Sequence, residues 1–401
     1  MTLVASVQRA TYYQFLAGAY FDTTLLALAK WPGEDCLLPK LSIIQDPLDP
    51  SIAPTGKFAQ PMVFFALEPI KKLAVSELSY EVKNLRLRVP ARQLARFLYN
   101  SPDSYPALRL LDLSTSHVSE GDIECIMGRF GTLEHLILDG SGVISHRADI
   151  EEEEWKRMWV RLGRIMAASG LKLAKEREKK LKEWLELQEL QAIMEGMQVQ
   201  EGVQPVHPRP TRRPRKGRKG LASSTISLRV PRNSHETPPS KSLPEDPRPG
   251  RGEPSDRPRL RIMPPQPRLR TISVNVPEYR KAPGDIKTLH STIRAEFARG
   301  WVEGLAIIAS RRRLLLQTWR NGGKIYLFRH HTSDSLEVEE ELDAKDENGL
   351  QGLVEMASSA DFDIRANSCP DLCLAGSGKR EAEHNELCGH SAGWSVWDDD
   401  L

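Results

Sequence analysis

The clearest pattern along the chain is a short apolar triplet that returns at nearly constant spacing. Each copy has an apolar residue, two others, a second apolar residue, one other and a third apolar residue. Such alternation places the second and third apolar side chains on one face of a short strand. The clear copies, 26 and 25 residues apart, are Val82/Leu85/Leu87, Leu108/Leu111/Leu113 and Leu133/Leu136/Leu138. Weaker copies occur at Leu38/Leu41/Ile43, Ile70/Leu73/Val75 and Leu269/Ile272/Val274.

Helix signals fill the gaps between the clear triplets. Pro90 stands where a first helical residue would, and apolar residues follow it at helical spacing. Ser119 and Asp122 form a capping-box-like pair before an apolar helix face, and Gly131 follows the end of that helix. Because one strand-turn-helix unit cannot bury its own apolar face, neighbouring units are expected to stack.

The predicted fold class is therefore α/β. We expect an irregular leucine-rich-repeat-like solenoid with parallel strands and helices, interrupted by a disordered insert. An unrelated α/β arrangement is the alternative, since leucine triplets also arise by chance.

The changing pattern divides the chain into four parts. Residues 1–200 are the leucine-rich-repeat-like N-terminal part, with a helical extension over 151–195 that we expect to break at Ser169-Gly170. Residues 201–262 are a Pro/Arg-rich insert, because 15 of the 28 prolines fall in 201–270 and helix and strand periods vanish there.

Order is predicted to return after the insert. Residues 263–330 read as a continuation of the repeat-like core, with a long amphipathic helix, a stop at Asn321-Gly322 and the strand KIYLFRH. Residues 331–401 read as an acidic C-terminal tail that is partly ordered. The apolar side chains that could hold this tail to the core are Leu372, Leu374, Trp394 and Trp397.

The net charge of +2 conceals opposite blocks. Residues 201–260 hold 14 basic and 6 acidic groups, whereas residues 331–401 hold 4 basic and 18 acidic groups. Five cysteines, an odd number spread along the chain, do not make the even framework of a disulfide-rich secreted domain. The N-terminal stretch approaches neither a signal peptide nor the roughly 18 to 20 apolar residues of a membrane span. These features predict a cytoplasmic or nuclear protein with no membrane partner.

The basic run in the insert is a candidate import or phosphate-binding patch. It lacks interleaved aromatic residues, so any contact with nucleic acid is expected to be salt-sensitive and independent of base sequence. A nuclear import receptor, a plain solvated linker and masking by the acidic tail are the other interpretations. The residues are Arg212, Arg213, Arg215, Lys216, Arg218 and Lys219.

A group of thiols and imidazoles near the C-terminus is the best candidate for chemistry. Any four of its members could hold a tetrahedral zinc ion, which would help to order the tail. The spacing matches no compact zinc-finger pattern, so the favoured interpretation is thiols that cluster without a metal, and no cofactor is assigned. The group consists of Cys369, Cys373, His384, Cys388 and His390.

No catalytic constellation survives inspection. GHSAG (389–393) resembles a nucleophile elbow around Ser391, but no histidine follows it to serve as the base. LAGSGKR (374–380) lacks the first glycine and the Ser or Thr of a phosphate loop. We therefore predict that the protein is not an enzyme.

The triplet strands supply a candidate surface for a protein partner. Side chains that alternate with the core-facing leucines are expected to be exposed on the strand-lined face of the solenoid. These residues are Arg86, Arg88, Asp112, Ser114, Ile137 and Asp139.

Several segments also carry a resemblance: WPGEDCLLPKLSII (31–44), YPALRLLDLS with GTLEHLILDG (105–140), AKEREKKLKEWLE (174–186), PQPRLRTISV and CGHSAGWSVWDDDL. The chain resembles basidiomycete fungal F-box proteins with ribonuclease-inhibitor-like leucine-rich repeats. The resemblance implies substrate recognition in a cullin-type ubiquitin ligase. The first 30 residues lack the Leu-Pro pattern of an F-box, which places docking to the ligase adaptor in doubt.

The function that we expect is a non-enzymatic protein-interaction scaffold. The alternatives are a nuclear nucleic-acid-associated protein that uses the basic insert and a zinc-binding protein that uses the C-terminal Cys/His group.

Overall fold

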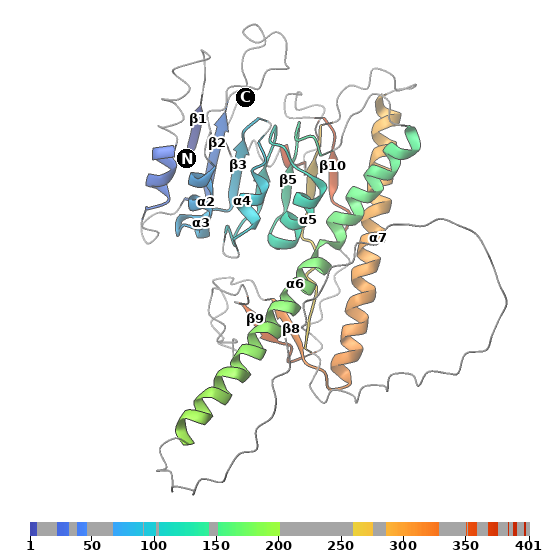
Figure 1. The fold of residues 1–401 in the computed structure, drawn as a ribbon. Helices are drawn as coiled ribbons and strands as arrows, with labels where there is room; N and C mark the ends of the chain where they lie inside the picture. Colours follow the sequence, from blue (N-terminus) through green and yellow to red (C-terminus); the bar gives the residue numbers. More distant parts are fainter. Residues whose placement is uncertain are drawn as a thin grey trace, which may run out of the picture. The chain divides into compact units, whose positions relative to one another are not determined.

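A computed structural model shows a mixed α/β protein with a parallel sheet and helices (Figure 1). The structure describes residues 1–5, 22–31, 38–45, 67–90, 92–101, 104–143, 151–200, 260–275, 286–328, 350, 352–358, 368–375, 384, 388–390 and 397. The chain divides into two units, one formed by Met1–Leu185 with Arg259–Leu401 and the other by Glu186–Pro258.

The main sheet, within the described residues, has seven strands in the order β1-β2-β3-β4-β5-β7-β10, and every neighbouring pair is parallel. Strand β5 pairs directly with β7, so the sheet continues across the long segment between them. The bounds are β1 (Thr2–Ala5), β2 (Lys40–Gln45), β3 (Asn84–Arg88), β4 (Leu110–Asp112), β5 (His135–Ile137), β7 (Thr271–Ser273) and β10 (Asp371–Cys373).

The apolar triplets explain the register of this sheet. Leu85, Leu111 and Leu136 lie side by side on β3, β4 and β5, and Ile272 continues the row on β7. All four side chains are buried in one hydrophobic core, as the strand prediction requires. The predicted strands at 38–43 and 269–274 are also present, as β2 and β7.

The weak triplet at Ile70/Leu73/Val75 is not a strand, and that prediction is wrong. The segment forms helix α2 (Glu68–Ala74), which has a proline in its first turn. Ile70 and Leu73 are three residues apart, a spacing that also serves one face of a helix, and both are buried there.

Short helices connect the strands on one side of the sheet (Figure 1). They are α2, α3 (Leu78–Glu81), α4 (Ala95–Tyr99) and α5 (Glu120–Arg129). Helix α5 has the predicted capping box, in which Ser119 Oγ accepts from the Asp122 N–H and Asp122 Oδ2 accepts from the Ser119 N–H. Helix α4 does not start at Pro90, because the carbonyl of Arg92 accepts from the His117 N–H of the next unit.

Two long helices pack against the sheet core and against each other. Helix α6 (Glu152–Gln200) contributes Trp159 and α7 (Ile286–Arg320) contributes Trp301 to the main hydrophobic core. The predicted break at Ser169-Gly170 is absent, since α6 runs through it. Gly170 instead makes room for the carbonyl of Pro265, which a Cβ at that position would overlap.

A second sheet, with the order β6-β8-β9, corrects two predicted boundaries. Strand β6 (Arg261–Ile262) lies inside the predicted insert of 201–262, whose residues 201–259 are outside the described part. Strand β8 (Ile325–Phe328), predicted to continue the repeat core, pairs with β6 and with β9 (Leu353–Glu355) instead. Glu178 of α6 ties β6 in place by accepting from the Ile262 N–H at 3.1 Å.

The C-terminal part contributes more to the core than the prediction of a partly ordered acidic tail implies. Strand β10 belongs to the main sheet, and Leu372, Leu374 and Trp397 are buried as predicted. Trp394 and most of the acidic stretch at 331–350 lie outside the described residues, as does the basic run at 212–219.

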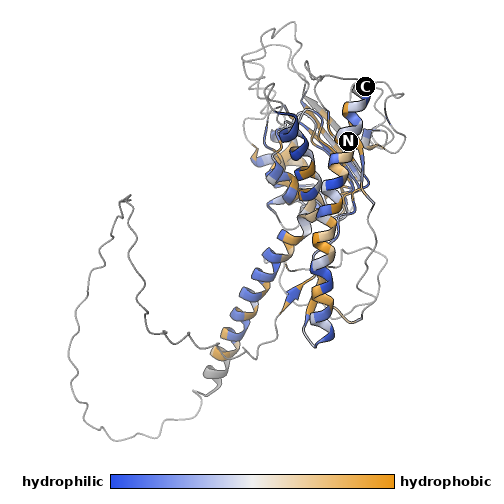
Figure 2. Ribbon diagram, turned by 90° about the vertical axis from the view of Figure 1, so that its right-hand side faces the viewer, coloured by the Kyte–Doolittle hydropathy of each residue, from blue (hydrophilic) through white to orange (hydrophobic). Residues whose placement is uncertain are grey.

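The two long helices alternate polar and apolar residues along their length (Figure 2). Among the described residues, no helix has both the length and the apolar character needed to cross a membrane.

Candidate metal centre

The face of the sheet opposite the leucine core is polar. Because side chains alternate along a strand, the neighbours of Leu85, Leu111 and Leu136 point to this second face. The register aligns them in one row across the sheet, and the row ends at a cysteine of β10. Its members are Ser42, Arg86, Asp112, Ile137, Ser273 and Cys373.

The six residues predicted to bind a protein partner belong to this face, but their predicted exposure is wrong. The side chain of Arg88 is 25% exposed. The other five, Arg86, Asp112, Ser114, Ile137 and Asp139, are between 0% and 4% exposed. The reason is that the C-terminal part of the chain lies over them: Trp397 stacks on Arg86, and His390 contacts Asp139.

A buried ion-pair network forms at the centre of the polar face. Asp112 Oδ2 lies 2.8 Å from Arg88 Nη2 and 3.5 Å from Arg86 Nε, and its Oδ1 accepts from the hydroxyl and the N–H of Ser114. Two guanidinium groups thus face the carboxylate of Asp112 in a buried setting, where an ion pair needs good geometry to be stable.

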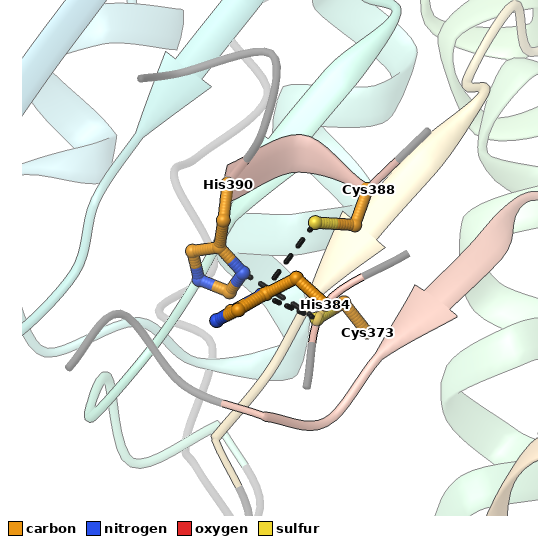
Figure 3. A group of neighbouring side chains, drawn as sticks. All are labelled: Cys373, His384, Cys388 and His390. Atoms are coloured by element: carbon orange, nitrogen blue, oxygen red, sulfur yellow. Dashed lines mark hydrogen bonds between the residues drawn. The ribbon is translucent and has the colours of Figure 1, made fainter. Parts of the chain in front are cut away.

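Four thiol and imidazole groups meet at the end of the same face (Figure 3). Cys373 ends β10, and Cys388 directly precedes the helical pair Gly389–His390. Their ligand atoms lie within 4.8 Å of one another, and this is the one such group found among the described residues. Cys373, Cys388 and His390 are buried, and His384 is half-buried.

Three of the six separations between these ligand atoms match the edge of a tetrahedral zinc site. With Zn–S of about 2.3 Å and Zn–N of about 2.0–2.1 Å, a sulfur and a nitrogen ligand lie about 3.5 Å apart. Here Cys373 Sγ is 3.4 Å from His390 Nδ1 and 3.5 Å from His384 Nδ1, and Cys388 Sγ is 3.6 Å from His384 Nδ1. Two sulfur and two nitrogen donors in this arrangement suit zinc.

Asp139 fixes the orientation of one of these imidazoles. It lies two residues after the end of β5 in the chain, and its Oδ2 lies 2.5 Å from His390 Nε2. In that contact the Nε2–H of His390 donates to the carboxylate of Asp139. The other ring nitrogen, Nδ1, then faces Cys373 Sγ, where a metal would be bound. A carboxylate behind a metal-ligating histidine is the usual support for such a ligand.

Two of these groups, Cys373 and His390, have raised pKa values and hold their protons. The adjoining Cys388 thiol and burial raise the pKa of Cys373. Burial would lower the pKa of His390, but its hydrogen bonds with Asp139 and Cys388 outweigh that effect and raise the pKa to about 9. Metal entry at this site must therefore release protons, as it does wherever thiolates are ligands.

The sequence identified all four of these residues but gave no reason to prefer them as a set. Cys369, the fifth candidate, is exposed and is not part of the group. Sequence inspection missed Asp139 as a metal-site residue, because it was assigned to a partner-binding surface. The signal that could have found it is its place directly after a predicted strand, at the edge where the carboxyl ends of parallel strands meet.

Comparisons with known proteins give no relative for this chain. No family model, no curated protein and no solved structure matches it.

Proposed function

We propose that the protein binds one zinc ion through Cys373, His384, Cys388 and His390, and that this ion fastens the C-terminal segment to the parallel sheet. The observation that carries the proposal is the set of three S···N separations of 3.4–3.6 Å, combined with the carboxylate of Asp139 behind His390. The proposal reverses the favoured sequence interpretation of thiols that cluster without metal.

The ion would be structural rather than catalytic. Catalytic zinc sites keep one coordination position for water or substrate, whereas four protein ligands fill a tetrahedron.

The ligands come from positions that are separated in the sequence. Cys373 belongs to strand β10, whereas Cys388 and His390 follow 15 and 17 positions later in the chain. A metal that bridges them would add stabilisation to the contacts that already hold them against the sheet.

Metal analysis of the purified full-length chain tests the proposal. We expect one zinc per chain in the wild-type protein and almost none in Cys388→Ser. Cys369→Ser is the matched control, since that thiol lies outside the group, and it should retain the full zinc content. Sub-stoichiometric zinc in wild-type protein supplied with zinc during expression would contradict the proposal.

A protein-interaction scaffold is the second candidate function. It is favoured by the parallel strands that follow one another in chain order with aligned leucines, an arrangement expected of stacked leucine-rich repeats. The resemblance to F-box proteins makes a cullin-type ubiquitin ligase the partner to test. Recovery of cullin and its adaptor in an affinity purification would support that role, and their absence would count against it.

A further inference from the structure

Most of the large apolar side chains that are exposed in the described part of the chain lie on the two long helices. On α6, Leu187, Leu190 and Met194 have a three-four spacing that places them on one face of the helix, here named the α6 stripe. On α7, Ile307 and Leu314 are two turns apart and form the α7 stripe. The five side chains are between 47% and 64% exposed, which is uncommon for apolar groups that lie side by side on a surface.

The two stripes have matching dimensions. Each has two apolar residues seven positions apart, a separation of about 10.5 Å along a helix. Between these residues the α6 stripe has Leu190, whereas the α7 stripe has the small, exposed side chain of Ser310. A leucine opposite a small residue allows two helices to pack closely, as a knob fits into a hole.

The charges beside the two stripes are opposite. Residues 183–194 of α6 contain three glutamates and no lysine or arginine, whereas residues 305–320 of α7 contain four arginines and no acidic residue. These charges belong to each helix whatever local pairs the individual side chains form. Arg313 and Arg320 are exposed, and within the described residues neither takes part in an ion pair. Opposite charges beside an apolar helix contact determine which partner binds and in which direction.

The same charges favour one orientation of the two helices. In an antiparallel pair with Leu187 next to Leu314, the three glutamates of α6 lie beside residues 312–318, a segment that contains arginines and no acidic residue. In a parallel pair with the stripes in register, Glu183 would face Glu303 instead. The like charges would then oppose the contact.

We propose that the protein self-associates by packing the α6 stripe of one copy antiparallel against the α7 stripe of a second copy. Each copy carries both stripes, so a two-fold pair makes this contact twice. The second contact matters because one helix contact of two turns is small for a stable interface. None of the proposed zinc ligands takes part, so the inference is independent of the metal site.

Analytical ultracentrifugation of the full-length protein over a series of concentrations tests the proposal. We expect a reversible dimer, and Leu190→Glu, which places a charge within the α6 stripe, should raise its dissociation constant by about tenfold or more. Val302→Glu is the matched control and should leave the constant unchanged. It changes another exposed apolar residue of α7, which lies about 140° around the helix from Ile307. Wild-type protein that stays monomeric up to its solubility limit would overturn the inference.

An exchange of charges tests whether these two stripes are the ones that meet. Arg313→Glu with Arg320→Glu should weaken the dimer, and so should Glu183→Arg with Glu186→Arg, because each pair of changes places like charges across the contact. A chain with all four substitutions has opposite charges again and should recover the dimer. A folded four-substitution variant, verified by circular dichroism, that remains monomeric would contradict the pairing of the stripes. A dimer that none of these changes weakens would place the interface elsewhere.

Discussion

Asp139 positions one of the four ligands of the proposed zinc site. The carboxylate does not belong to the four candidate ligands, but it holds His390 in the tautomer and orientation that direct Nδ1 inward. The same position was expected to be an exposed contact for a partner, and it is 4% exposed.

Replacing this carboxylate should weaken zinc binding without abolishing it. We expect Asp139→Asn to lower zinc affinity by about 10- to 100-fold, because the ligand is no longer held by a charged acceptor. Competition against a chromophoric chelator measures the change. Glu134→Gln is the control, since it removes a carboxylate that pairs with Arg270 and should leave the affinity unchanged. Equal affinities in wild-type protein and Asp139→Asn would show that Asp139 does not position a ligand.

Among the helices and strands, α5 has the feature that the sequence predicted most completely, its N-terminal capping box. Burial pushes the pKa of Asp122 upward, but hydrogen bonds from Ser119 and Tyr99 outweigh it and hold the pKa below its ordinary value of 3.8. A carboxylate with a lowered folded-state pKa stabilises the protein above the unfolded pKa, and this stabilisation is lost as the pH falls through the folded-state value.

The stability cost of Asp122→Asn should therefore depend on pH. We expect a loss of about 0.5–2 kcal/mol in the free energy of unfolding near neutral pH, the range for loss of a helix cap. The difference between wild-type protein and variant should shrink below about pH 3.8, where the carboxylate of the unfolded chain is protonated. Urea denaturation over a pH series measures it, and a difference that stays constant with pH would contradict the role of the charge.

The close contact between α6 and α7 depends on glycines of α7, whose role cannot be read from the sequence around them. A Cβ on Gly300 would overlap the carbonyl oxygen of Val160, and one on Gly304 would lie 2.7 Å from Ala167 Cβ. Such close approach of two helix backbones leaves no space for a side chain.

Two Gly→Ala substitutions should therefore have different effects on stability. We expect Gly300→Ala to destabilise the protein by about 1–3 kcal/mol or more, because the helices must move apart. Gly121→Ala, at an α5 position where the nearest atom to the new Cβ is Ser119 Oγ at 3.8 Å, should be neutral or stabilising by up to about 1 kcal/mol. Equal effects in chemical denaturation would mean that helix propensity, rather than the crossing, sets the outcome.

These elements show what the sequence could predict and why the rest escaped it. Local patterns predicted the strands that contain Leu85, Leu111 and Leu136, because period-two alternation can be read from neighbouring residues. The start of α5 was predicted for the same reason, since Ser119 and Asp122 lie close together in the sequence. The continuity of α6 through Gly170 was missed because a glycine within a helical pattern usually indicates a break. Its role here is to let the carbonyl of Pro265 approach the helix, and that contact cannot be read from the neighbouring sequence.

At the scale of the whole molecule, the site depends on contacts that no periodicity encodes. Asp139 and His390 are separated by 251 positions in the chain, and they meet because β10 joins the sheet beside β7. In the sequence, the Cys/His group and the polar strand positions are two separate features. In the structure they are in contact, since Gly389 and His390 lie against residues of the polar strand face.

Zinc should accordingly stabilise the whole main unit. Free zinc at about 100 times its dissociation constant is expected to add about 2.7 kcal/mol to the free energy of unfolding relative to the metal-free protein. Thermal unfolding with zinc and with excess chelator measures this change. Cys388→Ser should melt at the same temperature under both conditions, and a wild-type protein that responds no more than this variant would contradict the structural role.

X-ray absorption spectroscopy of the zinc-loaded, full-length protein identifies the ligands of the proposed site. We expect a four-coordinate ion with two sulfur ligands at about 2.3 Å and two imidazole nitrogens at about 2.0–2.1 Å. A zinc environment of oxygen and nitrogen alone, without a sulfur shell, would contradict it.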